Sequence, residues 1–115
     1  MAYAIEGTDE FIVWFAGLSS HEKASVAAKI DVLETFGPAL GRPNVDTVEG
    51  SRHRNMKELR IQHAGRPYRV FFIFDPRRAA ILLIGGRKSG KGFYKRMIPK
   101  ADDVYEQYVK EEGLG

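Results

Sequence analysis

The sequence predicts an α+β fold in which a small antiparallel sheet packs against helices. Two observations carry this prediction: apolar residues recur at helical spacing over 8–37, and three β-type runs occupy 56–84. After residue 99 the chain returns to helical spacing. The expected element order is therefore β-α-α-β-β-β-α, in a single domain of residues 1–115.

The first part of the chain is expected to form a short strand, residues 3–6, and two helices joined by a tight turn. The apolar face of the first helix comprises Phe11, Trp14, Phe15 and Leu18, a helical spacing that is typical of core packing. Ser19 and Glu22 form a capping-box pattern at the start of the second helix, and Gly37-Pro38 ends it. Residues 39–54 show no clear period and are expected to form a connecting loop.

Three strands are expected after this loop, over residues 56–62, 68–74 and 79–84. The last strand is apolar throughout, which is typical of a central strand covered on both faces. Asp75-Pro76-Arg77-Arg78 is expected to turn the second strand into the third. A basic loop should follow Gly85-Gly86, and Pro99 should open the final helix. Three acidic residues are interpreted as charges at the start of that helix rather than as a catalytic pair: Asp102, Asp103 and Glu106.

The pairing of the first two of these strands decides which cations meet. If their apolar faces coincide, Leu59 pairs with Val70, and Arg60 then lies opposite Arg69. Directly opposed like charges destabilise a sheet by roughly 0.2–1 kcal/mol, so this arrangement works against folding unless an anion binds there. We therefore predict an anion site around Arg60 and Arg69.

The distribution of charge points to a polyanionic partner. The net charge is +3, yet residues 1–50 carry 3 Lys or Arg and 8 Asp or Glu, whereas residues 52–100 carry 14 and 2. Such a dense basic segment favours nucleic acid, because binding phosphates releases their counterions. The alternative is a solvated basic face, which is less natural for arginines on strands.

Composition also excludes several kinds of site. The chain has no cysteine, so it has no disulfide, no thiolate nucleophile and no Cys-type zinc site. The histidines are scattered, the complete phosphate-loop spacings are absent, and we expect neither a metal nor a cofactor. No stretch is long and apolar enough to cross a membrane, and the N-terminus lacks the order of a signal peptide, so we expect a cytoplasmic protein without membrane contact.

The basic residues suit the cleavage of RNA without a metal, a reaction that needs a base, cations around the phosphorane and an acid. Arg60 and Arg69 stay protonated, so they suit phosphate clamping. Lys88, beside Arg87, is a candidate base if positive surroundings and partial burial lower its pKa. Tyr94 could stack on a base or transfer a proton, especially if nearby cations favour its phenolate.

Several motifs together resemble the RelE/ParE superfamily, nearest to HigB-like toxins and their phage-derived relatives. They are Met56-Lys57-Glu58-Leu59-Arg60, Gly65-Arg66, Tyr68-Arg69-Val70, Phe74-Asp75-Pro76-Arg77-Arg78, Lys88-Ser89-Gly90 and Met97-Ile98-Pro99. The similarity is strongest over 56–109, and the preceding helix pair fits the same order. The combination is specific, although each motif alone is not.

This resemblance implies a RelE-like fold and the toxin of a type II toxin–antitoxin pair, which cleaves mRNA in the ribosomal A site. It implies that the catalytic residues are Arg60, Arg69, Lys88 and Tyr94. It also implies five positioning residues for RNA or the ribosome: Lys57, Arg66, Lys91, Lys95 and Arg96. The expected partners are the ribosome, mRNA and a cognate antitoxin of the HigA-like type with a helix-turn-helix domain. Arg87 departs from the pattern, because relatives often carry an acidic residue there.

Two other functions fit the same fold. ParE-like members of the superfamily poison DNA gyrase and show no nuclease activity, so the fold alone does not assign the target. A non-catalytic nucleic-acid-binding or repressor-assembly module would grip phosphate without chemistry. The combination of the four catalytic candidates favours RNA cleavage over both.

Overall fold

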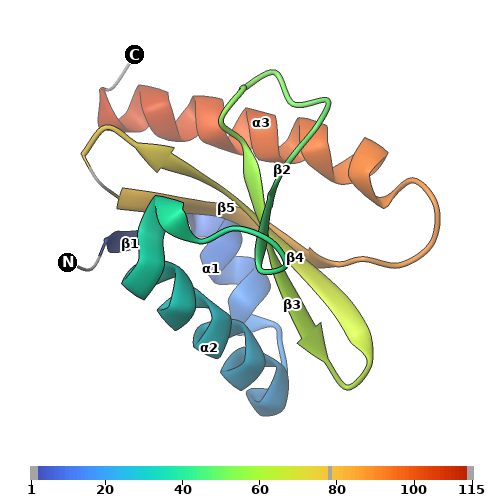
Figure 1. Ribbon diagram of the computed structural model, residues 1–115. Coiled ribbons are helices and arrows are strands. Elements are labelled where there is room, and N and C mark those ends of the chain that lie inside the picture. Colours follow the sequence, from blue (N-terminus) through green and yellow to red (C-terminus); the bar gives the residue numbers. More distant parts are fainter. Residues whose placement is uncertain (1–2, 78, 114–115) are drawn as a thin grey trace.

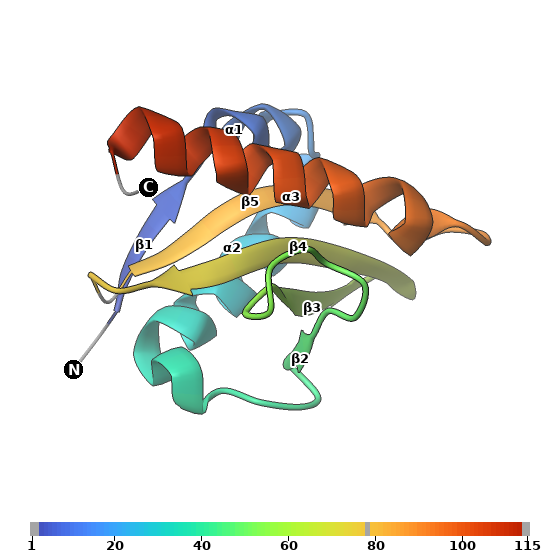
Figure 2. The same ribbon diagram turned by 90° about the horizontal axis from the view of Figure 1, so that it is seen from above.

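The structure, a computed structural model that describes residues 3–77 and 79–113, is built around a five-stranded sheet with the order β1-β5-β4-β3-β2 (Figure 1). Its elements are β1 (Ala4–Gly7), α1 (Asp9–Ala16), α2 (Ser20–Phe36), the 3-10 helix η1 (Gly37–Ala39), β2 (Val45–Thr47), β3 (Lys57–His63), β4 (Arg66–Asp75), β5 (Ala79–Arg87) and α3 (Phe93–Glu112). The predicted α+β class and its helix layers are confirmed. Figure 2 shows α2 and α3 on opposite sides of the sheet.

Two apolar cores lie on the two faces of the sheet. From β5, Ala80 and Leu82 join the core beneath α1 and α2, whereas Ile81 and Leu83 join the core beneath α3. All four side chains are 1% exposed or less, and burying a side chain such as leucine contributes about 1.5–3 kcal/mol. The prediction that this strand is covered on both faces is confirmed.

The helix boundaries at the N-terminal side follow local capping. The side chain of Thr8 accepts a hydrogen bond from the backbone of Phe11 and so begins α1. Ser19 and Glu22 form a complete capping box at the start of α2, and Gly37 ends that helix with a positive φ of 56°. The predicted helix pair and its connecting turn are confirmed.

The predicted pairing of β3 with β4 is also confirmed. Leu59 pairs with Val70 and Arg60 with Arg69. The turn itself is shorter than expected and comprises only Ala64-Gly65, whose φ values of 51° and 76° suit a two-residue hairpin with the twist of the strands. The register of this hairpin places both arginines on the face that α3 covers.

Two features of the sheet differ from the prediction of a purely antiparallel arrangement. Strand β1 pairs with β5 in parallel, so the sheet is mixed. The chain between β1 and β5 is long and includes α1 and α2. Parallel strands need such a long connection, whereas a short hairpin can join only antiparallel strands. In addition, the expected loop 39–54 overlaps the last residue of η1 and contains β2, which pairs with β3.

The boundaries near the C-terminal side also differ. Strand β5 continues through Gly85-Gly86 to Arg87, because these glycines make room for side chains: a Cβ on Gly85 would lie 2.3 Å from the Trp14 ring. Helix α3 begins at Phe93, so Pro99 lies inside the helix rather than at its start. In the expected turn after β4, Arg78 lies outside the described residues.

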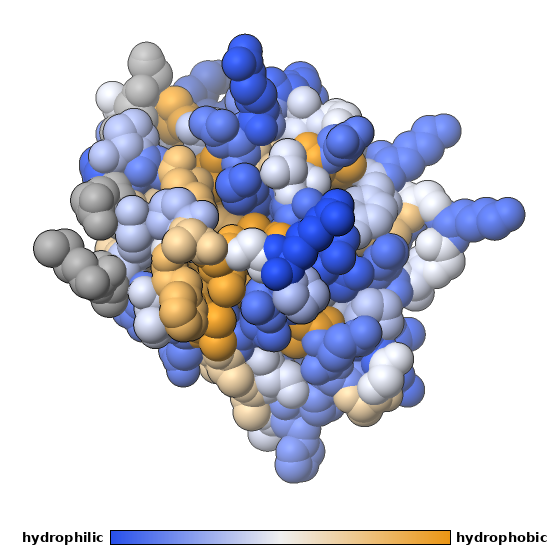
Figure 3. Space-filling model, viewed as in Figure 1, coloured by the Kyte–Doolittle hydropathy of each residue, from blue (hydrophilic) through white to orange (hydrophobic). Residues whose placement is uncertain are grey.

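The face of the molecule shown in Figure 3 is mostly hydrophilic. On the face shown in Figure 3, an apolar band lies among hydrophilic side chains, on the side where Figure 1 shows α2. Among the residues that the structure describes, three large apolar side chains are mostly exposed, namely Ile12, Val13 and Phe36. Within residues 3–77 and 79–113, no helix has the length and apolar character needed to cross a bilayer.

Candidate active site

The hairpin of β3 and β4 places two guanidinium groups beneath the first turns of α3. Arg69 is buried, with 8% of its surface exposed, whereas about a third of the Arg60 side chain is exposed. Arg69 Nη1 donates to the backbone oxygen of Tyr68, 3.0 Å away, which fixes the guanidinium against its own strand. The cations that the sequence predicted to meet therefore do lie opposite each other.

A carboxylate that the sequence reasoning missed lies between the two arginines. Glu58 is only 4% exposed, and its Oε2 accepts from Arg60 Nε at 3.0 Å while its Oε1 lies 3.7 Å from Arg69 Nε. The expectation that the opposed arginines destabilise the fold without a bound anion is thus wrong, because Glu58 supplies the negative charge. Glu58 is on the same face of the strand as Arg60, two residues away, and this spacing was a signal that could have revealed it.

Tyr94 reaches this cluster from the first turn of α3. Its hydroxyl donates to Glu58 Oε1 at 2.7 Å and accepts from Arg69 Nε at 3.2 Å. Burial raises the pKa of Tyr94 above its ordinary value, and the hydrogen bond to Glu58 raises it further, outweighing the opposite effect of Arg69. Tyr94 is therefore a protonated donor here, and the condition that nearby cations favour its phenolate is not met.

Lys88 joins the cluster from the end of β5. Its backbone N–H donates to the oxygen of Pro67 at 2.8 Å, which ties the start of the loop to β4. Its Nζ lies 5.1 Å from the centre of the Tyr94 ring, within the range of a cation–π interaction. All four predicted catalytic residues thus converge, with Lys88 on the outer side of Tyr94.

A hollow of about 410 Å³ opens beside this cluster, and we call it the site hollow. Its lining includes Asp46, Val48, Glu58, Arg60, Lys88, Tyr94 and Ile98. Arg60 Nη2 lies 3.3 Å from Asp46 Oδ2, so this guanidinium bridges β2 and β3. Asp46 belongs to the segment that was expected to be a loop, and the sequence reasoning therefore missed it as well.

The five predicted positioning residues lie outside the lining of the site hollow. Lys57 lies on β3, with its Nζ 3.4 Å from Thr47 Oγ1, and the other four are exposed. Arg66 begins β4, and Lys91 lies in the loop before α3. Lys95 and Arg96 lie on the first turns of α3. The described lining of the site hollow includes none of the five, so they could contact a ligand only outside it.

The acidic residues predicted at a helix start instead anchor the wall of the site hollow. Asp102 lies inside α3, is 1% exposed, and accepts from Ser51 Oγ at 2.5 Å and from Arg52 N at 3.0 Å. Arg52 also donates to Asp103 and Glu106. The earlier start of α3 explains this difference. The anchored segment follows Val48, so Asp102 and its neighbours hold the connection from β2 to β3 against α3.

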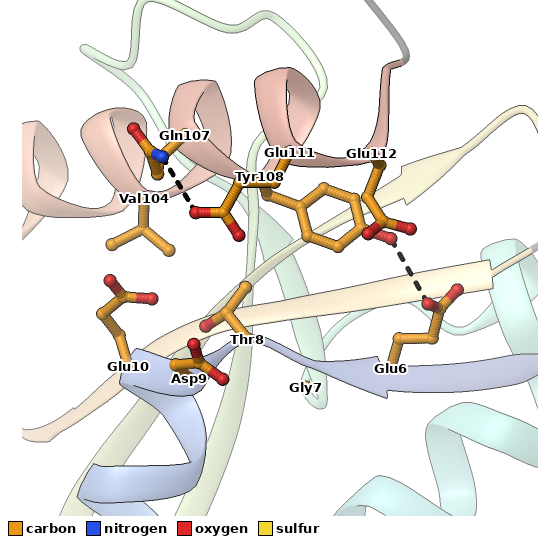
Figure 4. Close-up of a pocket in the computed structure, with 10 residues that line it drawn as sticks. All are labelled: Glu6, Gly7, Thr8, Asp9, Glu10, Val104, Gln107, Tyr108, Glu111 and Glu112. Carbon is orange, nitrogen blue, oxygen red and sulfur yellow. Dashed lines mark hydrogen bonds between the residues drawn. The ribbon is translucent and has the colours of Figure 1, made fainter.

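The far end of α3 carries the opposite charge. A second hollow, of about 220 Å³, lies between α3, β1 and the start of α1, and Figure 4 shows its acidic side chains. These are Glu6, Asp9, Glu10, Glu111 and Glu112. Tyr94 and Tyr108 are separated by about 21 Å along an ideal helix of 1.5 Å rise per residue. The cations around Tyr94 and this acidic hollow, where Arg77 pairs with Glu6 and Glu112, therefore lie near opposite ends of α3.

Comparison with known proteins assigns the family. Residues 13–106 match the model of the family described as phage-derived protein Gp49-like. The chain belongs to the Gp49-like family. Its Gp49-like sequence is 50% identical over 104 residues to "Putative toxin HigB3" of Mycobacterium tuberculosis, covering 89% of this chain and 90% of the relative. It is 46% identical over 101 residues to "Putative toxin HigB2" of the same organism, covering 85% of this chain but spanning only 50% of that relative.

Solved structures show the same fold at low sequence identity. The match to the intact Escherichia coli RelBE toxin-antitoxin complex has a TM-score of 0.60 at 12% identity, covering 77% of this chain and 100% of the other. The match to the isolated Escherichia coli RelE toxin has a TM-score of 0.59 at 13% identity, covering 86% and 98%. The predicted RelE-like fold and the relationship to HigB-like proteins are confirmed.

Proposed function

We propose that this Gp49-like protein is the toxin of a type II toxin–antitoxin pair and cleaves mRNA on the ribosome without a metal. The observation that carries the proposal is the convergence of Arg60, Arg69, Lys88 and Tyr94 around a buried carboxylate. The names of its HigB relatives support the toxin assignment. The cytoplasm is the expected compartment, because it contains the ribosomes.

In this mechanism the ribose 2′-oxygen attacks the adjacent phosphorus while the bond from phosphorus to the 5′-oxygen breaks. The products are a 2′,3′-cyclic phosphate and a free 5′-hydroxyl. Arg60 and Arg69 stabilise the negative charge of the phosphorane, as fixed cations do most effectively in a partly buried site. Arginine suits this role because its guanidinium keeps its proton and can bind two phosphate oxygens at once.

Two proton transfers complete the reaction. Tyr94 carries a proton at neutral pH, since its pKa is raised, and we assign it to protonate the leaving 5′-oxygen. The base that accepts the 2′-hydroxyl proton is either Lys88, as the sequence suggested, or Glu58. Glu58 is already a hydrogen-bond acceptor beside both arginines, which supports its candidacy.

The partner in this proposal is a cognate antitoxin of the HigA-like type, with a helix-turn-helix domain. One solved relative of the same fold is part of a toxin-antitoxin complex, which supports a partner of this class. The adjacent reading frame is the place to look for it. An adjacent small protein that neither binds nor neutralises the chain would count against the toxin assignment.

The test is induced expression of the chain followed by mapping of mRNA 5′ ends, together with translation of a defined mRNA by purified ribosomes. We expect cuts that leave 5′-hydroxyl ends. Tyr94→Phe removes only the hydroxyl and should slow cleavage by about 10²–10⁴-fold. Arg69→Lys keeps the positive charge but removes the planar guanidinium, which can bind two phosphate oxygens at once. This variant should slow cleavage by up to about 10²–10³-fold.

Lys88→Ala is the third variant to be tested for loss of cleavage. Its matched control is Lys110→Ala, which removes an exposed lysine of α3 that lies outside the site hollow. Translated mRNA that stays uncut in the presence of the unaltered chain would refute the nuclease assignment. DNA damage with intact mRNA would indicate gyrase inhibition. Binding with steep salt dependence, but no cutting and no effect of Tyr94→Phe, would indicate a non-catalytic nucleic-acid-binding module.

A further inference from the structure

A groove of about 570 Å³ runs along the open edge of β3, on the other side of Arg60 from the site hollow. We call it the edge groove. Its polar lining residues are Ser25, Lys29, Asn44, Arg60, Gln62 and Arg69. Figure 1 shows α2 alongside β3, and α2 contributes Ser25 and Lys29 to the groove. Among the described residues, β2 pairs with residues 57–59 of β3, so the part of β3 beyond Arg60 is left as an edge.

The edge groove is continuous with the candidate active site through the arginine pair. Arg60 lines both the groove and the site hollow. Arg69 lines the groove and at the same time donates to Tyr94. A phosphate bound at Arg60 therefore has the site hollow on one side and the edge groove on the other.

The charged residues that line the edge groove are all cations, namely Lys29, Arg60 and Arg69. The carboxylates that pair with the arginines, Asp46 and Glu58, line the site hollow instead. Lys29 Nζ donates to Asn44 Oδ1 at 2.7 Å, and an amide oxygen does not cancel its charge. An ammonium has three donors, so two remain for an anion.

The same groove offers groups that can recognise a base. The backbone N–H of Arg60 donates to the oxygen of Asn44 at 2.8 Å, which shows that the N–H of Arg60 points away from β4. The backbone groups of Gln62, two residues further along β3, point in the same direction, towards the open edge. The side chain of Gln62 is exposed, and its amide carries both donors and an acceptor. Exposed base edges of single-stranded RNA are read by groups of this kind.

We propose that the edge groove binds the RNA nucleotide adjoining the scissile phosphate, with Lys29 on its phosphate and Gln62 against its base. This inference rests on the proposed function and adds a substrate subsite to it. A peptide strand could pair with the same edge through its backbone, but backbone pairing does not use the three cations of the groove. The charge of the groove therefore favours RNA.

The experiment is quantitative mapping of mRNA 5′ ends in cells that express the unaltered chain or one variant. We expect Lys29→Ala to reduce cleavage roughly tenfold, the usual consequence of losing one charge-assisted hydrogen bond, and Lys29→Arg to restore most of it. Gln62→Ala should change the base frequencies at a position next to the cut. Lys100→Ala, on an exposed lysine of α3 outside both hollows, should match the unaltered chain.

Four outcomes would overturn the inference. Cleavage by Lys29→Ala at the unaltered rate, with unchanged base frequencies for Gln62→Ala, would refute the subsite and leave the proposed function intact. Equal losses in Lys29→Ala and Lys29→Arg with lowered melting temperatures would show that Lys29 is structural. Normal cleavage combined with escape from the antitoxin would assign the groove to the antitoxin. No cleavage by the unaltered chain would remove the proposed function and this subsite with it.

Discussion

The carboxylate between the two arginines can be tested by Glu58→Gln. Glutamine keeps the shape of Glu58 and can still accept from Tyr94, but it removes the negative charge. The Arg60 side chain is 36% exposed, so losing its ion pair costs about 0.5–1 kcal/mol. The Arg69 side chain is only 10% exposed, and leaving its charge without a carboxylate costs about 1.5–3 kcal/mol. The free energy of unfolding should therefore fall by about 2–4 kcal/mol.

The measurement is urea unfolding of the purified chain, followed by far-UV circular dichroism, together with a thermal melt. For a chain of this size, 1 kcal/mol corresponds to about 4 °C, so the melting temperature should fall by roughly 8–16 °C. The control is Asp103→Asn, which removes the charge of a 73% exposed carboxylate paired with Arg52. Because that pair is solvated, its loss should cost less than about 1 kcal/mol.

A Glu58→Gln loss no larger than that of Asp103→Asn would show that Glu58 does not hold the arginines together. A double-mutant cycle sharpens the test. When Arg69→Gln is added to Glu58→Gln, the second substitution should cost less than it does in the unaltered chain, because the unpaired cation is gone. Strict additivity of the two losses would contradict the ion pair.

Two further predictions concern other parts of the fold. Hydrogen bonds from Tyr68, the largest cause, and from Ser19 lower the pKa of Glu22 from 4.5 to about 2. The stability that this group contributes is present above pH 4.5 and is lost towards pH 2, so unfolding free energies should fall more steeply over that range in the native chain than in Glu22→Gln; parallel pH curves would contradict this. Gly85→Ala should cost about 1–3 kcal/mol in urea unfolding, because its Cβ would collide with Trp14, whereas Gly41→Ala meets no atom within 4 Å and should be nearly neutral.

Much of the site could be predicted because it depends on strand periodicity. The alternation of Leu59, Arg60 and Ile61 sets which face each side chain takes, and matching apolar faces then sets the register with Arg69. The convergence of Lys88 and Tyr94 was different, because the residues themselves gave no register for it. It followed from the family resemblance, and the structure reproduces the convergence while their chemical roles stay predictions.

The parts that escaped prediction depend on contacts between distant segments. The ion pair of Asp46 with Arg60 requires β2, whose three residues are too few to show a period. The two glycines after Ile84 looked like a loop, although Gly85 is a strand residue whose missing side chain accommodates Trp14, more than 70 positions earlier. A local sequence pattern does not show which distant residue a strand residue contacts. A glycine in a strand therefore does not reveal which side chain packs against it.

The separation of charge along α3 has a consequence for encounter kinetics. With cations gathered near Tyr94 and five carboxylates around the hollow near Tyr108, two of which pair with Arg77, charge is distributed unevenly along the longest helix. In the field of a large polyanion such a particle experiences a torque as well as an attraction, so it arrives already oriented. Productive collisions then form a larger share of all collisions, and added salt should slow association by screening both the attraction and the alignment.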